Sequence, residues 1–461
     1  NNLTDVAIAL NCGVAGPVTF NMQSSFTEQV TIAAINGVSA VNTITFNGNG
    51  NSISFAATVS TAPHTLALNG ADYLRFNNLV INGTGATYAL SCHLYNGANN
   101  NQFTNCTFNA PTTGTGTALS PFSLSGTSNT AIGTGVAGNN NIVSGCTMTG
   151  GYYGATAVSA TGGEATGNQF INCNVTEYYF YGIYTSYQNG AIIRGNTCER
   201  PSRTTVSTFY GIYSGTANSN TLIEKNRVRN PFGGATASTS TAYGIYISVA
   251  STAGNENRVY NNLVSDFNYG GIQYGIYVNG YTNVYHNTVS FEDVASATAS
   301  VTRGIYTASG TGSNFKNNIV SITRGGSGIK YCVYYVSNPV SSNNNNFYMG
   351  SVAGTNYIAY NGTSYSALAA WNAANPTYDG ASQSADPLYN NPIANDYTPT
   401  SNVMNAIGAP LGLTDDIIGI PRDLVTPDPG AYEYANATAP PSCATNITVN
   451  SSCITNTTIS W

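Results

Sequence analysis

A four-residue motif that returns at a nearly constant interval is the strongest constraint on what this chain can fold into. The motif is Tyr-Gly-Ile-Tyr, and its successive copies begin 29, 33, 31, 29 and 28 residues apart. An interval of this size indicates a solenoid, in which each repeat is one unit that stacks on the next. The copies and their two variants are Tyr181–Tyr184, Tyr210–Tyr213, Tyr243–Tyr246, Tyr274–Tyr277, Arg303–Tyr306 and Tyr331–Tyr334.

A second motif, with the pattern apolar-x-x-Asn-x-apolar, alternates with the first. One example consists of Ile223, Asn226 and Val228. Three repeats have cysteine in place of the asparagine, and the spacing varies from 23 to 40 residues, so the turns absorb insertions while the strands stay in frame. The predicted column consists of Asn47, Asn77, Cys106, Cys146, Cys173, Asn196, Asn226, Asn262, Asn287, Asn318 and Asn346.

This second motif predicts a kink between two short strands whose apolar side chains point inward. Asparagine tolerates the left-handed backbone of such a kink. Its amide can also bond to the asparagine one coil above and one below, which satisfies polar groups inside the turn. Glycine, β-branched residues and asparagine are poor helix formers. We therefore expect an all-β fold, a right-handed parallel β-helix of about 30 residues per coil.

The composition agrees with a stacked β-structure and excludes several partners. Only 7% of the residues are charged, against about 25% in an average soluble domain. Like charges stacked about 4.8 Å apart would repel each other, whereas asparagine and threonine can form ladders. The net charge of −6 argues against nucleic acid, which needs clustered lysine and arginine. No run of 18 apolar residues occurs, so we expect no membrane insertion.

The two motifs together resemble the repeat of the pectate-lyase-like right-handed β-helix superfamily. The resemblance covers roughly residues 40–350. It implies the fold but no particular activity, because the superfamily contains lyases, hydrolases, adhesins and inert stalks.

The C-terminal part contains in succession the stretches Tyr365–Trp371, Ala385–Tyr389, Thr414–Ile417 and Pro429–Tyr434. This succession resembles the closing segment of large secreted β-helix proteins of the Bacteroidota. The resemblance implies an extracellular or cell-surface location, secretion by the type IX route, and a role in gliding, attachment or prey capture. Residues 443–461 read as alternating strands and resemble the first strands of a fibronectin type III domain.

The expected organisation has five parts. Within the first, residues 4–12 form a short capping helix with Thr4 or Asp5 as N-cap and Gly13 as its stop. The parts are an N-terminal cap with the first strands (1–40), the β-helix coils (41–350), a C-terminal capping segment (351–434), a linker (435–442) and the start of a fibronectin-III-like domain (443–461).

The chain has nine cysteines, an odd count, so at least one is free or pairs outside the chain. Cys443 and Cys453 lie ten residues apart and are the predicted disulfide, which suggests an oxidising compartment. In the coil region, coil spacing is within disulfide reach, so Cys146 and Cys173 form either a second disulfide or part of a stack of buried thiols.

The last tyrosine of each motif copy should point outward, because strand alternation turns the isoleucine inward. Such a row has three interpretations. The rings stack on one another beneath the turns, they contact another chain, or they bind a glycan. The row consists of Tyr184, Tyr213, Tyr246, Tyr277, Tyr306 and Tyr334.

A cluster of charges lies on two neighbouring coils. Register places Arg194 beside Glu224 and Glu199 beside Arg229, which predicts ion pairs between coils; a site for an acidic polysaccharide is the alternative. The other members are Arg200, Arg203, Lys225 and Arg227.

We find no constellation with a catalytic pattern in the sequence. The coil region has three aspartates on different coils, and the three histidines share no column with a nucleophile. Adjacent Asp415 and Asp416 form either a capping turn or, less in keeping with the pattern, a Ca²⁺ site. The residues concerned are Asp72, Asp266, Asp293, His64, His93 and His286.

The sequence thus predicts a non-catalytic structural or adhesion module of a secreted cell-surface protein, without cofactor, able to form filaments or homo-oligomers. Copies of itself or other surface proteins are the expected partners. The alternative is a carbohydrate-active β-helix, either a polysaccharide lyase or hydrolase or a glycan-binding module.

Overall fold

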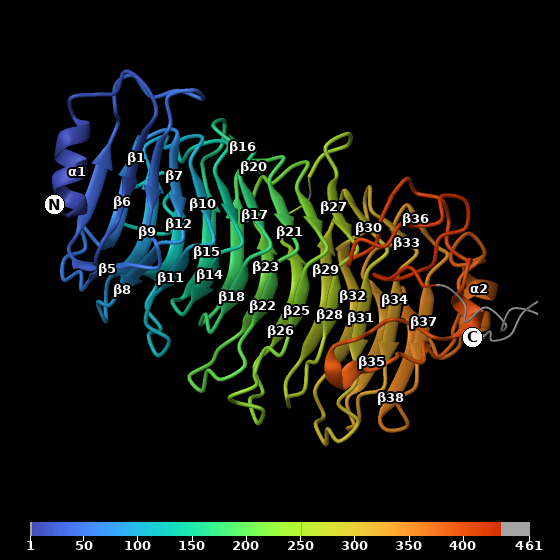
Figure 1. Ribbon diagram of the computed structural model, residues 1–461. Coiled ribbons are helices and arrows are strands. Elements are labelled where there is room, and N and C mark those ends of the chain that lie inside the picture. Colours follow the sequence, from blue (N-terminus) through green and yellow to red (C-terminus); the bar gives the residue numbers. More distant parts are fainter. Residues whose placement is uncertain (1, 250, 435–461) are drawn as a thin grey trace, which may run out of the picture.

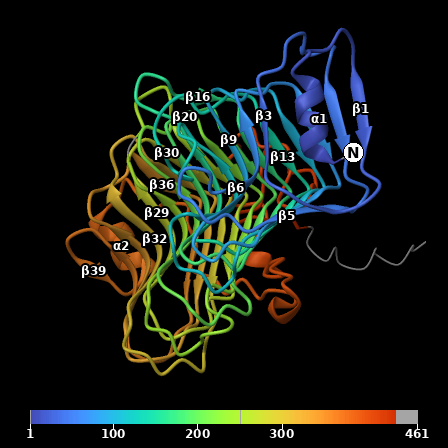
Figure 2. The same ribbon diagram turned by 90° about the vertical axis from the view of Figure 1, so that its left-hand side faces the viewer.

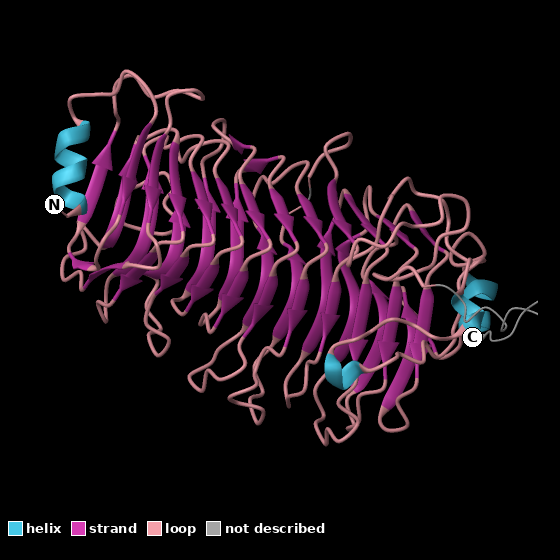
Figure 3. Ribbon diagram, in the orientation of Figure 1, coloured by secondary structure: helices cyan, strands magenta, loops and turns pink. Residues whose placement is uncertain are grey.

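The computed structural model describes residues 2–249 and 251–434, which form an all-β, right-handed parallel β-helix of about 12 coils (Figure 1). Each turn takes roughly 28 residues. Strands dominate the rod, and the helices lie toward its ends (Figure 3). No helix among the described residues is long and apolar enough to cross a membrane.

Each coil contributes one strand to each of three parallel sheets, which we call sheets A, B and C. Sheet A contains β1 (Val18–Asn21), β4 (Ile44–Asn47), β7 (Leu74–Asn77), β10 (Gln102–Thr104), β13 (Ile142–Ser144), β17 (Gln169–Ile171), β21 (Ile192–Arg194), β24 (Leu222–Glu224), β27 (Asn257–Tyr260), β30 (Thr282–Tyr285), β33 (Asn314–Lys316) and β36 (Ser341–Asn343).

Sheet B follows sheet A in every coil after a very short turn. It contains β2 (Phe26–Thr27), β5 (Ser52–Phe55), β8 (Val80–Gly83), β11 (Thr107–Asn109), β14 (Thr147–Thr149), β18 (Asn174–Thr176), β22 (Thr197–Glu199), β25 (Arg227–Arg229), β28 (Leu263–Ser265), β31 (Thr288–Phe291), β34 (Ile319–Ile322) and β37 (Asn346–Met349).

Sheet C holds the longest strands and ends in an antiparallel strand, β39. It contains β3 (Val30–Ala33), β6 (His64–Asn69), β9 (Ala89–Tyr95), β12 (Leu119–Leu124), β15 (Tyr153–Val158), β19 (Tyr181–Ser186), β23 (Phe209–Ser214), β26 (Ala242–Ile247), β29 (Gln273–Asn279), β32 (Thr302–Ser309), β35 (Ile329–Tyr335), β38 (Thr355–Tyr360) and β39 (Ser364–Tyr365). The remaining elements are β16 (Ala165–Thr166), β20 (Gln188–Asn189), α1 (Leu3–Leu10), α2 (Leu368–Ala374) and the 3₁₀ helices η1 (Pro392–Ala394) and η2 (Asn402–Met404).

Turns of different length leave the strand register intact. In sheet A, Gln102 pairs with Ile142 across a 40-residue step, and Gln169 pairs with Ile192 across a 23-residue step. The side chains that point inward stack coil on coil and form one continuous core. Phe46 and Phe76, for example, stack with ring centroids 4.8 Å apart.

Helix α1 lies across the N-terminal end of the rod and packs on β3 (Figures 1 and 2). It starts one residue earlier than predicted. The N-cap is Asn2, not Thr4 or Asp5, because the Asn2 side chain accepts from the Asp5 amide at 2.9 Å in a reciprocal capping box. Thr4 instead donates its hydroxyl to Glu28. At the other end α2 covers β38 and β39 and buries Trp371.

A ladder of side chains runs through the turn between sheets A and B, which we call the A–B corner. The Nδ2 of Asn226 donates to Oδ1 of Asn262 at 2.9 Å and to the carbonyl of Ile193 at 2.8 Å. The same pair of bonds repeats at Asn262, Asn287 and Asn318. The asparagines of this ladder are Asn196, Asn226, Asn262, Asn287, Asn318 and Asn345.

Cysteine takes the same place in three earlier coils. The thiol of Cys146 donates to the carbonyl of Phe103, as the asparagine amide does elsewhere, and the amide of Cys106 donates to Cys146 Sγ at 3.3 Å. Cys146 and Cys173 are free thiols, so no disulfide joins them. The predicted pair Cys443 and Cys453 lies outside the described residues.

Three residues of the predicted column lie outside the ladder: Asn47, Asn77 and Asn346. In the strand pairing of sheet A, Asn77 lies beside Asn47 and Thr104, and Thr104 is two positions before the ladder residue Cys106. The side-chain amide of Asn77 donates to Asn47 Oδ1 on the outside of the sheet. Leu79 occupies the ladder position of that coil, since its neighbour Val80 pairs with Thr107.

In the last coil the ladder residue is Asn345, because Asn346 pairs with Ile319 one position later.

A second, buried ladder lies where sheet C turns into sheet A, and sequence reasoning missed it. There Asn141 Oδ1 accepts from both the amide and the side chain of Asn101.

Candidate functional site: the tyrosine face

Sheet C carries on its outer surface two adjacent columns of tyrosine rings, which together we call the tyrosine face. The predicted row forms the second column, and Tyr360 extends it by one coil. The first tyrosine of each motif forms the other column, which sequence reasoning missed. The first column is Tyr153, Tyr181, Tyr210, Tyr243, Tyr274, Arg303, Tyr331 and Tyr357. The second is Tyr184, Tyr213, Tyr246, Tyr277, Tyr306, Tyr334 and Tyr360.

Both tyrosines of a motif point outward because the strand does not alternate there. In β23 the pattern from Tyr210 to Tyr213 is half-buried, buried, buried, half-buried. Gly211 and Ile212 therefore both face the interior. A simple strand would have turned one of the two tyrosines inward.

The rings form a herringbone. Within a column neighbouring rings are nearly parallel: Tyr210 and Tyr243 lie 4.7 Å apart at 5°, and Tyr213 and Tyr246 lie 5.2 Å apart at 5°. Between columns they meet edge to face, as Tyr210 and Tyr213 do at 90°. Offset stacking and edge-to-face contact are the two favourable arrangements of aromatic rings. Each ring face is largely used by a neighbour, so the surface presents ring edges and hydroxyl groups.

Burial raises the pKa of several phenols of this face. Burial raises the pKa of Tyr184 to about 12 and that of Tyr210 to about 12, with a further contribution from Tyr213 in both cases. Burial also raises the pKa of Tyr246, with Tyr277 as the next cause. A neutral phenol is both donor and acceptor, so each hydroxyl can pair with a polar group of either kind.

Arg303 is the one charged side chain among the described residues of the two columns. Its guanidinium lies 4.6 Å from the ring centre of Tyr334 and 5.2 Å from that of Tyr274, and it also donates to the Tyr274 hydroxyl. Cation–π contact of this kind is favourable. Arg303 therefore replaces a tyrosine in the first column without breaking the face.

The predicted ion pairs between coils are present. Arg194 pairs with Glu224, and Arg229 Nε lies 2.9 Å from a Glu199 oxygen. The other cations of this region are used internally. Arg200, which has no exposed surface, donates to the carbonyls of Pro231 and other loop residues. Buried cations that hold the junctions of sheets B and C in this way are Arg200, Arg203, Arg324 and Lys330.

The three histidines are engaged in structural contacts. His93 is fully buried; its Nε2 bonds to the Thr127 carbonyl at 2.8 Å and its Nδ1 to Ser123 at 2.7 Å. Because a carbonyl only accepts, Nε2 carries the proton and Nδ1 accepts from the serine. Burial lowers the pKa of His93 to about 4 and that of His64 to about 4. Both rings are neutral at pH 7.

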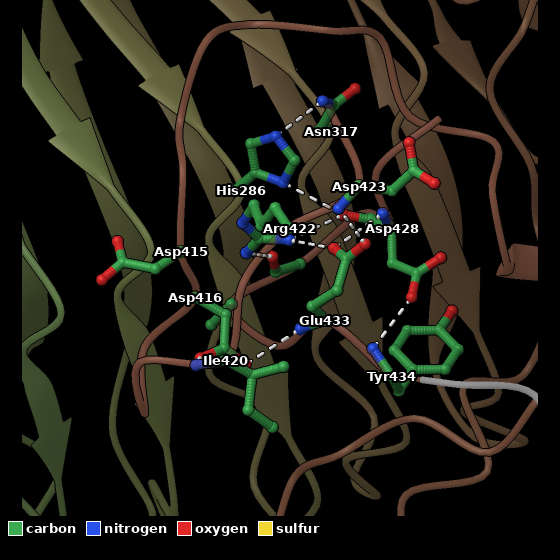
Figure 4. A network of polar contacts seen from close by, with 12 residues as sticks. His286, Asn317, Asp415, Asp416, Ile420, Arg422, Asp423, Asp428, Glu433 and Tyr434 are labelled. Carbon is green, nitrogen blue, oxygen red and sulfur yellow. Dashed lines mark hydrogen bonds and ion pairs between the residues drawn. The ribbon is translucent and has the colours of Figure 1, made fainter. Parts of the chain in front are cut away.

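Residues 385–434, which we call the closing segment, run back along the A–B corner (Figure 4). There Arg422, 4% exposed, donates to Asn261 Oδ1 at 2.8 Å and to Glu433 at 2.9 Å. Asp428 accepts from the amides of Ala406 and Tyr434. Glu433 and Tyr434, which lie in the stretch Pro429–Tyr434, take part in these contacts.

The closing segment attaches to the residue that precedes the ladder asparagine in each of the last five coils. These corner residues all have a left-handed backbone, which turns their side chains outward. Asn317, for example, pairs with both the carbonyl and the amide of Ala409 at 2.8 Å. The five corner residues are Lys225, Asn261, His286, Asn317 and Asn344.

The adjacent aspartates serve different structural contacts. Asp416 has no exposed surface and caps a turn by accepting from the amides of Ile418 and Ile420. Asp415 pairs with Lys225. Within the part of the chain that the structure describes, no three His, Cys, Asp or Glu side chains are placed to hold a metal ion.

Comparisons with known proteins assign no function to this chain. No protein-family model matches the chain, and no curated protein matches it. One similar solved structure is that of PfbA, a surface adhesin of Streptococcus pneumoniae. It superposes with a TM-score of 0.41 at 11% identity, over 78% of this chain and 89% of that one. At so low a likeness, the function has to be argued from this chain's own residues.

Proposed function

We propose that the protein is a non-catalytic adhesion or structural module of a secreted cell-surface protein, and that it makes contact through the tyrosine face. The observation that carries the proposal is the pair of stacked columns, which follow sheet C from β15 to β38. Tyrosine is enriched where protein surfaces meet, because it combines a large apolar ring with a polar tip.

The shape of the molecule supports this use. About 12 coils at about 4.8 Å give a rod roughly 60 Å long. Helices α1 and α2 close its two ends, so stacking of coils end on end is blocked. Contact is left to the long sides of the rod, and the tyrosine face is one of them.

The groups that could carry chemistry support a non-catalytic role, because they are engaged in structural contacts. The histidines are buried and neutral, the buried arginines hold loops, and the ion pairs join neighbouring coils. An extracellular location, type IX secretion and a role in gliding, attachment or predation remain part of the proposal through the resemblance of the closing segment.

A second candidate is a glycan-binding or glycan-cleaving β-helix. Arg303, in the middle of a line of phenol hydroxyls, is the observation that favours it, since a cation among hydroxyls suits an acidic sugar chain. Stacked ring faces count against it, because sugars bind best to open aromatic faces.

The test compares the wild-type rod with a Tyr246→Ser/Tyr277→Ser double variant on protein-coated surfaces and on a polysaccharide array. Tyr285→Ser is the matched control, because Tyr285 stacks on Tyr260 at 5.2 Å on sheet A, away from the tyrosine face. We expect retention to fall at least about tenfold in the double variant only. Unchanged retention would overturn the proposal. New reducing ends or unsaturated products on the array would establish the second candidate instead.

A further inference from the structure

We infer that the partner of the tyrosine face is a second copy of this chain, lying antiparallel against it. This inference rests on the proposed function and specifies what the contact surface meets. Three properties of the face lead to it: its repeat, its hydrogen-bonding chemistry and its area.

The tyrosine rings recur along the face at a constant interval, and only a partner whose groups recur at the same interval can contact every ring. Ring centres follow one another at 5.0 Å from Tyr184 to Tyr213 and at 4.8 Å from Tyr277 to Tyr306, which is the rise of one coil. A surface without this period would meet one or two rings well and the rest poorly. A second copy is commensurate with it along the whole face, at every offset of one coil.

The chemistry of the face is self-complementary. Each phenol can donate to, and accept from, a phenol of the other copy. A phenol carries no charge near neutral pH, and burial raises the pKa of Tyr184 and Tyr210 further, so two such faces approach without the repulsion that would separate like charges. Raised phenol pKa values support this step, but the geometry of the columns carries it.

Arg303 favours an antiparallel second copy over a parallel copy in register. In a parallel arrangement without offset, the two Arg303 guanidinium groups would face each other and repel. In an antiparallel arrangement, the Arg303 of one copy meets tyrosines of the other unless the two-fold axis passes through its own coil. Arg303 already packs on Tyr274, Tyr306 and Tyr334, so a further ring completes the same kind of contact.

The area predicts that this association is weak. Seven coils give a length of about 30 Å, and two ring columns give a width of about 10 Å, so each copy buries roughly 300 Å². Stable protein interfaces bury about 800 Å² per partner. We therefore expect a dissociation constant of about 0.1–1 mM for two free rods. Many copies on one surface would raise the effective concentration and make the contact persist.

Sedimentation velocity on the whole chain, from dilute solution up to about 1 mM, tests the inference. The wild type should shift reversibly from monomer toward dimer. Tyr246→Ser/Tyr277→Ser should weaken the dimer at least about fivefold, whereas Tyr285→Ser should leave it unchanged. A Tyr246→Phe/Tyr277→Phe variant keeps the stacking and guards against a loss that merely reflects misfolding; it should fold and associate less than the wild type.

The outcomes separate this inference from the proposed function. A wild type that stays monomeric overturns the inference, as does a dimer that Tyr285→Ser weakens and the double serine variant does not. If the rod stays monomeric but still binds a protein-coated surface through Tyr246 and Tyr277, the adhesion proposal stands and the second copy is the wrong partner. If the double serine variant keeps both the dimer and the retention on protein-coated surfaces, the inference and the adhesion proposal are both wrong.

Discussion

Gly211 in sheet C faces the Val228 side chain in sheet B so closely that a methyl group on Gly211 would lie 2.2 Å from Val228 Cγ1. The same contact occurs in four other coils, where a glycine of sheet C meets a valine of sheet B. It explains why glycine follows the first tyrosine: the strand must press its backbone against the valine while both tyrosines point outward. The other pairs are Gly154 with Val175, Gly244 with Val264, Gly275 with Val289 and Gly304 with Val320.

A Gly211→Ala substitution should therefore lower the free energy of unfolding by about 1–3 kcal/mol through overpacking. Adding Val228→Ala should recover part of this loss, because it removes the γ-carbons that the new methyl group would strike. Chemical denaturation of the wild type, both single variants and the double variant gives the coupling energy. Strictly additive effects would show that the close approach of these two residues is not the cause.

The corrected ladder register leads to a second prediction. Asn226→Ala leaves the amide and the side chain of Asn196 without their acceptor, in a place with no exposed surface. We expect a loss of about 2–4 kcal/mol, since each orphaned buried group costs about 1–3 kcal/mol. Asn77→Ala is the matched control, because Asn77 bonds to Asn47 on the half-exposed outside of sheet A. It should cost less than about 1 kcal/mol. Equal losses in thermal or urea unfolding would contradict the register.

The repeat in the sequence is enough to predict the β-helix, because motif spacing, strand alternation and the polar kink all lead to one architecture. It was not enough for the exact ladder register. Leu74, Asn77 and Leu79 follow the same pattern as a true ladder coil, and only strand pairing shows that Asn77 lies outside the column. In the run of asparagines before Phe347, the sequence contains nothing that distinguishes Asn345 from Asn346.

Of the two tyrosine columns, the sequence predicted only the second, because the expected strand geometry was too regular. Strict alternation assigns one outward tyrosine to each motif, whereas the inward pair Gly211 and Ile212 turns two outward. The sequence did contain a signal. Two tyrosines three residues apart cannot both point outward from a regular strand, and the repeated glycine between them marks a place where the strand departs from regular alternation. The partners of the closing segment could not be predicted, because they join residues as far apart as Asn261 and Arg422.

Arg422 should hold the closing segment on the coils. Replacing it by methionine removes bonds to Asn261, Gly430 and Glu433 at once and leaves the half-buried Glu433 carboxylate without its cation. Breaking a buried pair by removing one partner typically costs about 3–5 kcal/mol. We expect faster hydrogen exchange in residues 385–434, with little change in the early coils. Arg258→Met, at an exposed arginine, is the control. Uniform loss of protection along the rod would contradict a local role.

His93 predicts how stability changes with pH. Its pKa is about 4 in the folded protein, below the usual 6.5, so the unfolded chain takes up a proton first as the pH falls. Stability is therefore lost as the pH drops from about 6.5 toward 4, by at most about 3 kcal/mol for this fully buried ring. Asp428 changes the stability in the opposite direction. Burial raises its pKa to about 6, so the folded chain takes up this proton first and gains stability as the pH falls.

Comparison of the wild type with His93→Gln isolates the histidine, since Asp428 contributes equally to both. Glutamine can still donate to the Thr127 carbonyl and accept from Ser123, but it does not titrate. In urea unfolding at pH 7 and pH 5, the wild type should lose about 1–2 kcal/mol more stability than the variant between the two values. An identical loss in both proteins would mean that His93 protonates in the folded state at its ordinary pKa, and that the contacts to Thr127 and Ser123 do not keep it neutral.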